Sequence, residues 1–113
     1  MKIIRDKLGE KISKRDIDLI YKDGEAFKVC ISRHFHETLL RAKLIEEAKE
    51  VKSANSKSEL ISELADCWEV IKHIAEFNDI ELDEIFAHAE IKEQKLGGFR
   101  ETWLYSRPEL KDE

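Results

Sequence analysis

The chain has 113 residues, a length that fits one domain able to bury a core without disulfides or a structural metal. Charged residues make up 40% of it and hydrophobic residues 42%, which favours long solvated helices over a sandwich of short strands. The net charge of -5 excludes the broad positive field that supplies most of the affinity for nucleic-acid backbones, so no polynucleotide partner is expected.

The amino-terminal part has the least regular pattern. Residues 2–14 mix apolar and basic side chains at helical spacing, which predicts a short helix or an ordered arm. Gly9 within this segment lowers its helix propensity. Residues 15–33 contain the turn signal Lys22-Asp23-Gly24 and a β-prone stretch, 27–31, that predicts a strand or extended chain. We therefore expect residues 1–33 to form an arm with a possible small extended segment.

Two long amphipathic helices are predicted next. Apolar residues repeat at helical spacing from about 34 to 53, and a polar turn follows. Ser56 and Glu59 have the spacing of a capping box, so a second helix is expected to begin there and to continue to about Phe77. The short turn makes the two helices antiparallel neighbours.

A third helix is predicted over 82–96, where Gly97-Gly98 stops it as a carboxy-terminal cap. Residues 99–105 are expected to extend across the bundle, and the tail from Ser106 is expected to fray. The sequence thus predicts one all-α domain, with core helices over 34–96 and an extended tail over 97–113.

The sequence also bears on compartment. No apolar run is long enough to span a bilayer, and the basic start of the chain leads into charged residues instead of a signal-peptide core, so a cytoplasmic protein without a membrane partner is expected. Cys30 and Cys67 lack metal-site spacing and are expected to pack as small apolar residues.

Carboxylates of the two central helices lie beside apolar residues. With 3.6 residues per turn, Glu63 points into the apolar stripe of the second helix and Asp66 lies at its edge. On the preceding helix Glu46, Glu47 and Glu50 lie together beside the stripe, with Glu47 nearest to it. Like charges one turn apart destabilise a helix, and a partly buried carboxylate costs more unless it is paired or bound to metal. The two helices therefore predict a shared cation.

Oxygen-only ligands, without histidine or thiolate at matching spacing, favour Mg²⁺ or Mn²⁺ over zinc. The alternative is that the acids of the first helix coat a solvated face while Glu63 pairs with a lysine across the bundle. Glu69 and Glu76 are expected to face solvent in this ordinary way. Because the unusual positions occur on both neighbouring helices, the metal site is favoured.

Glu46-Glu47-Ala48-Lys49-Glu50, followed after twelve residues by Glu63-Leu64-Ala65-Asp66, resembles the EExxE...ExxD signature of the MazG-like superfamily. These are all-α nucleoside triphosphate pyrophosphohydrolases, related to phosphoribosyl-ATP pyrophosphohydrolase and dimeric dUTPase. Ile4-Arg5-Asp6-Lys7-Leu8 is similar to the VRDK start of one branch, and Lys95-Leu96-Gly97-Gly98-Phe99 to its K-R-G-G-F ending. Leu96 departs from the arginine of that branch.

The resemblance implies Mg²⁺-dependent cleavage of a nucleoside triphosphate to monophosphate and pyrophosphate, often as house-cleaning, and a homodimer or homotetramer in which a partner copy completes the bundle. The implied metal ligands are Glu47, Glu50, Glu63 and Asp66. Glu46 and Glu47 are the implied catalytic residues, and Glu46 would act either as a base or by hydrogen bonding to a metal ligand. The implied phosphate-binding cations are Lys43, Lys92, Lys95, Arg5, Lys7 and Arg100. For each of the lysines the alternative is a solvated surface position.

Two other functions remain open from the sequence. One is phosphoribosyl-ATP hydrolysis, and the other is a non-enzymatic helical oligomerisation or regulatory module. Trp68 and Phe99 are candidates for stacking a base, although Trp68 lies on an apolar stripe that is typical of a core. The four histidines have no ligand spacing and are expected on the surface.

Overall fold

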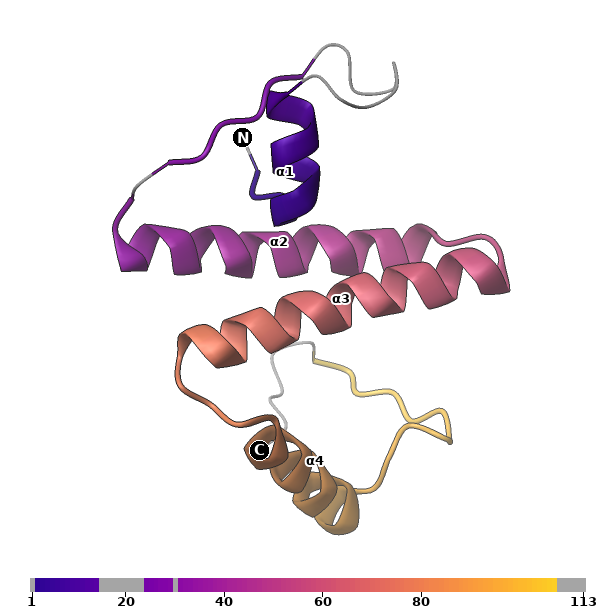
Figure 1. Ribbon diagram of the computed structural model, residues 1–113. Coiled ribbons are helices and arrows are strands. Elements are labelled where there is room, and N and C mark those ends of the chain that lie inside the picture. Colours follow the sequence, from indigo (N-terminus) through magenta and orange to yellow (C-terminus); the bar gives the residue numbers. More distant parts are fainter. Residues whose placement is uncertain (1, 15–23, 30, 108–113) are drawn as a thin grey trace.

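The computed structural model describes residues 2–14, 24–29 and 31–107, which form four helices and no strand (Figure 1). The helices are α1 (Asp6–Ser13), α2 (Arg33–Ser53), α3 (Lys57–Phe77) and α4 (Leu82–Leu96). The all-α prediction is confirmed for this part of the chain. Gly9 lies inside α1, and the stretch expected as strand or extended chain is non-helical connection at 27–29 and 31. The expected turn residues Lys22 and Asp23, Cys30 and the end of the tail lie outside the described residues.

Serine caps define where the two long helices begin. The Ser32 hydroxyl accepts a hydrogen bond from the Phe35 amide at 3.2 Å, and the Ser56 hydroxyl accepts one from the Glu59 amide at 3.1 Å. Each cap satisfies an amide that has no partner within its helix. The Glu59 carboxylate accepts from the amide of Asn55, one residue before the position that a strict capping box requires.

Helices α2 and α3 form an antiparallel hairpin. We describe its contacts as levels, each level being a place along the hairpin where a residue of α2 faces a residue of α3; three such levels follow one another at intervals of two helical turns. At one level the Arg33 guanidinium lies 4.4 Å from the centre of the Phe77 ring and donates to the Phe77 carbonyl oxygen. Two turns along each helix lie Leu40 and Val70, both buried. A further two turns bring Glu47 of α2 to the level of Glu63 of α3. One apolar level thus separates a cation–aromatic level from an acidic one.

The two shorter helices flank this hairpin. In Figure 1, α1 lies beyond α2 and α4 lies beyond α3, on opposite sides of the pair. The turn into α4 is tight, because Asp79 has a φ of 55° and the Ile80 amide donates to the Ala75 carbonyl oxygen at 2.9 Å. Glu81 and Glu84 form a capping box at the start of α4 that the sequence interpretation did not include.

Gly97 ends α4 as predicted. Its φ of 86° lies in the region that favours glycine, and its amide donates to the Glu93 carbonyl oxygen at 2.8 Å. The residues after it do not cover the bundle: Phe99 is 94% exposed and Trp103 86% exposed. Residues 99–105 are non-helical, and their aromatic side chains are not packed against the helices of the single chain.

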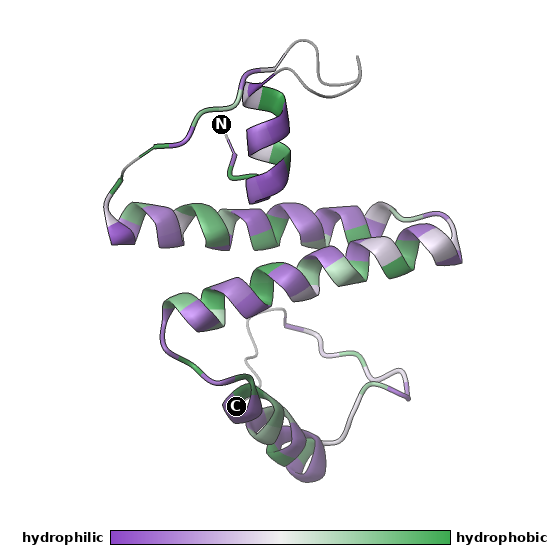
Figure 2. Ribbon diagram, in the orientation of Figure 1, coloured by the Kyte–Doolittle hydropathy of each residue, from purple (hydrophilic) through white to green (hydrophobic). Residues whose placement is uncertain are grey.

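The described part of one chain encloses little apolar surface. Its buried hydrophobic residues are Leu40, Val70 and Ala75, and Figure 2 shows hydrophobic positions spread along all four helices instead of gathered at one centre. The radius of gyration is 17.7 Å, whereas a compact domain of this length has about 13 Å. Trp68 stacks on Phe86 with ring centroids 5.7 Å apart, yet it stays 39% exposed, so the single chain does not make it a core residue. None of the described helices combines the length and apolar character needed to cross a membrane.

Candidate metal centre

Three carboxylates from α2 and α3 converge at the acidic level of the hairpin. Glu47, Glu63 and Asp66 each offer an oxygen, and these oxygens all lie within 4.8 Å of one another. Glu47 comes two turns after Leu40 on the apolar stripe of α2, which explains why it is buried. Glu63 and Asp66 lie one turn apart on the face of α3 that meets α2, and both are half-buried.

The surroundings of Glu63 disfavour its charged form in the ion-free protein. Loss of contact with water raises the pKa of Glu63, and the charges of Asp66, Glu50 and Glu47 raise it further. The same surroundings raise the pKa of the Cys67 thiol, chiefly by burial and then through the charges of the carboxylates, so the thiol stays protonated at neutral pH. A divalent cation would relieve the repulsion, and a set of carboxylate oxygens fits a hard ion such as Mg²⁺.

Basic side chains already surround the carboxylates. The Lys43 ammonium lies 3.3 Å from Glu47 Oε1 and 3.5 Å from Glu46 Oε1. Arg5, from the segment that precedes α1, donates to Asp66 Oδ1 at 2.9 Å, and Lys2 donates to Glu46 Oε1 at 2.9 Å. Positive groups from two separate parts of the chain thus meet the acids of the hairpin.

The other predicted acids lie at the margin. Glu50 is exposed and does not belong to the group of three, although its charge acts on Glu63. Glu46 also lies outside the group. Its hydrogen bond with Lys2, together with the charge of Lys43, lowers its pKa and raises that of Lys2. Glu46 is therefore a weaker base in this arrangement than an unpaired glutamate.

Of the six predicted phosphate-binding cations, Arg5 and Lys43 contact the acidic residues. Lys7 is exposed and forms no ion pair with the described residues. The remaining three belong to α4 or to the segment after it, which Figure 1 places on the far side of α3 from α1. Within one chain they do not join the acidic group; they are Lys92, Lys95 and Arg100, the last of which pairs with Glu93 at 3.3 Å.

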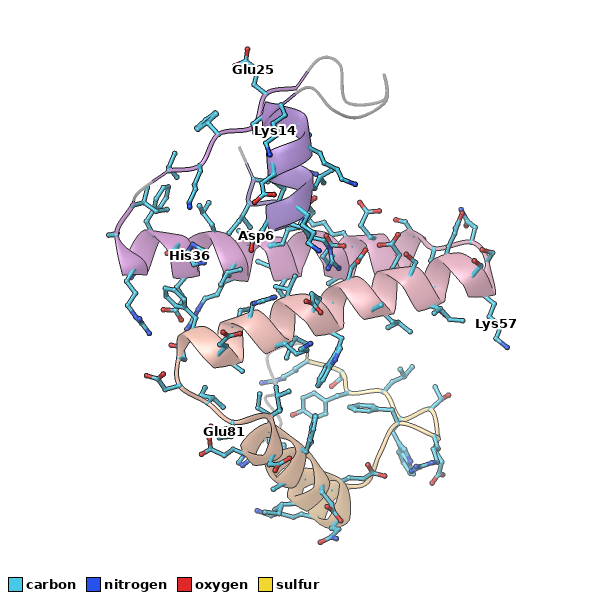
Figure 3. All side chains as sticks on the ribbon, viewed as in Figure 1. Asp6, Lys14, Glu25, His36, Lys57 and Glu81 are labelled. Carbon is cyan, nitrogen blue, oxygen red and sulfur yellow. The ribbon has the colours of Figure 1, made fainter. Side chains whose placement is uncertain are left out.

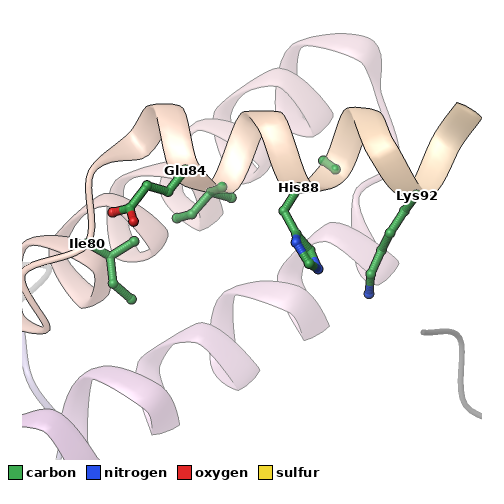
Figure 4. A pocket seen from close by; sticks show the side chains of 6 residues that line it. Ile80, Glu84, His88 and Lys92 are labelled. Carbon is green, nitrogen blue, oxygen red and sulfur yellow. The ribbon is translucent and has the colours of Figure 1, made fainter.

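Lys92 instead lines an open groove along α4 (Figure 4). The groove has a volume of about 450 Å³ and is mostly apolar, with His88 and Lys92 along its length. It does not include any residue of the acidic group. The groove and the carboxylates are therefore separate features of the single chain.

The sequence interpretation did not single out Lys2. The available signal was its position three residues before Arg5, on the same basic segment that was expected to form an ordered arm. Figure 3 labels Asp6 next to α2 and Lys14 at the opposite end of α1, so the amino-terminal end of α1 is the end directed at the hairpin. A residue just before that end can reach the acids, whereas one at the far end cannot.

Comparisons with protein-family models, with curated proteins and with solved structures returned no significant match to this chain. Three carboxylate oxygens at this spacing, with two basic groups beside them, are able to hold a hard divalent cation and to approach a phosphate-bearing ligand.

Proposed function

We propose that the chain is a Mg²⁺-dependent nucleoside triphosphate pyrophosphohydrolase that releases pyrophosphate and a nucleoside monophosphate, with house-cleaning of unwanted nucleotides as its role. The observation that supports this most directly is the convergence of Glu47, Glu63 and Asp66 within 4.8 Å. The sequence pattern around these residues, which resembles the MazG-like signature, gives the reaction class.

In this proposal Glu47, Glu63 and Asp66 hold Mg²⁺, and Glu50, whose charge already acts on Glu63, is a further ligand. A bound Mg²⁺ would stabilise negative charge on the phosphate oxygens and activate a water molecule for attack. The side chains of the protein then have separate tasks. Lys43, half-buried beside Glu47, fixes the orientation of that carboxylate. Glu46 accepts a proton once Lys2 no longer occupies it.

The single chain leaves large apolar side chains uncovered, which supports assembly with a second copy into a homodimer or homotetramer. On α3 Leu60, Leu64 and Trp68 follow one another at intervals of about one turn along one side of the helix, and they are 39%, 50% and 39% exposed. Isolated exposed apolar residues are ordinary, but a continuous apolar face marks an interaction surface. In such an assembly the candidates to reach a nucleotide from a partner copy are the cations that stay away from the acidic group within one chain, Lys92, Lys95 and Arg100.

The test is a pyrophosphate-release assay with canonical, deoxy and damaged nucleoside triphosphates and with phosphoribosyl-ATP, each with and without Mg²⁺. We expect Glu63→Gln to lower turnover by about a hundredfold or more, because it removes a ligand charge from the centre. Glu76→Gln is the matched control, since Glu76 lies on the same helix and its side chain is 81% exposed. Turnover by Glu63→Gln at the wild-type rate would defeat the proposal. Turnover confined to phosphoribosyl-ATP would assign the activity of histidine synthesis.

A second candidate is a non-enzymatic helical oligomerisation or regulatory module, which the uncovered apolar face also supports. The two functions differ in what Mg²⁺ does. Stabilisation of the fold by Mg²⁺ without turnover of any nucleotide in the panel would favour the module. Stabilisation together with pyrophosphate release would favour the enzyme.

A further inference from the structure

The amino-terminal segment is attached to the acidic face of the hairpin at two points. Arg5 donates to Asp66 at 2.9 Å, and Lys2 donates to Glu46 at 2.9 Å. The two acids differ in one respect: Asp66 belongs to the group of three converging carboxylates, whereas Glu46 does not. The arm, which we define as residues 2–13, therefore holds one candidate metal ligand and one neighbour of the ligands.

We propose that this arm is an ion-exchange latch, in which Arg5 occupies Asp66 in the ion-free protein and a divalent cation displaces it toward the phosphates of the substrate. The inference rests on the proposed metal centre and adds a conformational step to it. Lys2 stays on Glu46 in the first stage of this exchange, so the arm pivots instead of leaving the hairpin.

Charge and exposure make the exchange feasible. A guanidinium 2.9 Å from a ligand oxygen repels a dication bound to the same carboxylate, so the two cations compete for Asp66. The side chains of Arg5 and Asp66 are 59% and 35% exposed, and exposed pairs of this kind are weak. Little therefore opposes the displacement of Arg5 by an ion with twice its charge.

The displaced group suits the substrate. A guanidinium offers a planar fork of donors that matches two oxygens of a phosphate, which an ammonium does not. Because Arg5 starts within hydrogen-bond distance of Asp66, it is released beside the place where the phosphates of a metal-bound nucleotide would lie. Metal binding would thus free the Arg5 guanidinium to bind the phosphates of the substrate.

A different role for Arg5 predicts the opposite effect on metal affinity. If Arg5 held Asp66 in its coordinating orientation from behind, as hydrogen-bonded partners of metal ligands often do, its loss would weaken metal binding. If Arg5 competes with the metal, its loss strengthens metal binding. The sign of the change therefore separates the two roles.

The experiment uses the full chain and Mn²⁺ alone as the probe, with affinity measured by calorimetry. The variant is Arg5→Gln, and the matched control is Lys11→Gln, which removes one positive charge from an exposed position on the same arm. We expect Arg5→Gln to bind Mn²⁺ about two- to fivefold more tightly than both the wild type and Lys11→Gln. With Mn²⁺ bound, inorganic pyrophosphate should bind Arg5→Gln about tenfold more weakly than the wild type.

Hydrogen exchange gives a readout that does not depend on affinity. In the wild type, Mn²⁺ should speed exchange of the α1 amides, and in Arg5→Gln these amides should exchange quickly before Mn²⁺ is added. Equal or weaker Mn²⁺ binding by Arg5→Gln relative to Lys11→Gln, or α1 exchange that Mn²⁺ does not change, would overturn the latch. If neither the affinity change nor the exchange change is seen, but Glu63→Gln weakens Mn²⁺ binding by the wild-type chain, only the latch is rejected. If the wild-type chain binds no Mn²⁺ at all, both the latch and the proposed metal centre are rejected.

Discussion

Replacement of Glu63 by glutamine should have opposite effects on stability without and with Mg²⁺. Burial and the neighbouring carboxylates raise the pKa of Glu63 in the folded, ion-free protein. A raised pKa in the folded state means that its contribution to stability is present below the unfolded pKa and is lost as the pH rises through the folded one. At neutral pH the ionised side chain therefore destabilises the ion-free fold, and Glu63→Gln should melt at a higher temperature than the wild type in the presence of a chelator.

The Mg²⁺ response of the wild type can be estimated. At a free Mg²⁺ concentration one hundred times the dissociation constant, binding to the folded state alone adds about 2.7 kcal/mol to the free energy of unfolding. A chain of 113 residues unfolds with an entropy of about 0.24 kcal/mol/K near 60 °C, so its melting temperature should rise by about 11 °C. Glu63→Gln should lose most of this rise, whereas the exposed control Glu76→Gln should keep it.

The assay is thermal unfolding at one protein concentration, in chelator and in Mg²⁺, from about pH 4, near the ordinary pKa of a glutamate, to about pH 8, where carboxylates are ionised. The advantage of Glu63→Gln in chelator should shrink toward the acid end, where the wild-type carboxyl is protonated too. The reasoning is refuted if Glu63→Gln melts below the wild type in chelator at neutral pH, or if Mg²⁺ raises both melting temperatures equally.

Three further substitutions test the fold and the assembly. Leu40→Ala should lower the free energy of unfolding by about 2 to 3 kcal/mol because Leu40 is buried, while Ile45→Ala, at a 62% exposed position, should cost much less; urea titration compares them. Ser56→Ala should cost about 1 kcal/mol through loss of the hydrogen bond from Glu59 to the cap, with Ser58→Ala as the uncapped control in the same titration. Trp68→Glu should reduce the assembly to a 13.3 kDa monomer in sedimentation equilibrium, and an unchanged mass would remove the α3 face from the interface.

Local sequence patterns predicted the helices well because the signals that end helices are local. Ser56 caps α3 and Gly97 ends α4 as expected, and the observed helix bounds lie close to the predicted ones. The positions of Glu47 and Glu63 on inward-facing stripes followed from helical geometry alone. These features depend on residues within one or two turns of one another.

Features that depend on packing between distant segments were not predictable in the same way. Nothing in the periodicity places Lys2 on Glu46, since 44 positions separate them. The exclusion of Glu50 from the converging group depends on the register between α2 and α3, which two amphipathic patterns do not determine by themselves. The exposure of Trp68 depends on which element covers α3. The sequence pattern of an apolar stripe does not distinguish a stripe covered by its own chain from one covered by a partner.

The distance between the apolar and the acidic contacts of the α2–α3 hairpin affects which substitutions this protein can accept. Leu40 and Val70 stand two turns, about 10 Å, from Glu47 and Glu63, and at that separation the energetic effects of substitutions are usually independent. Substitutions of Glu47 or Glu63 should therefore leave the stability contributed by Leu40 and Val70 unchanged. Under the proposed function, the acidic residues could thereby acquire a different ion or substrate preference while the helices keep the same framework.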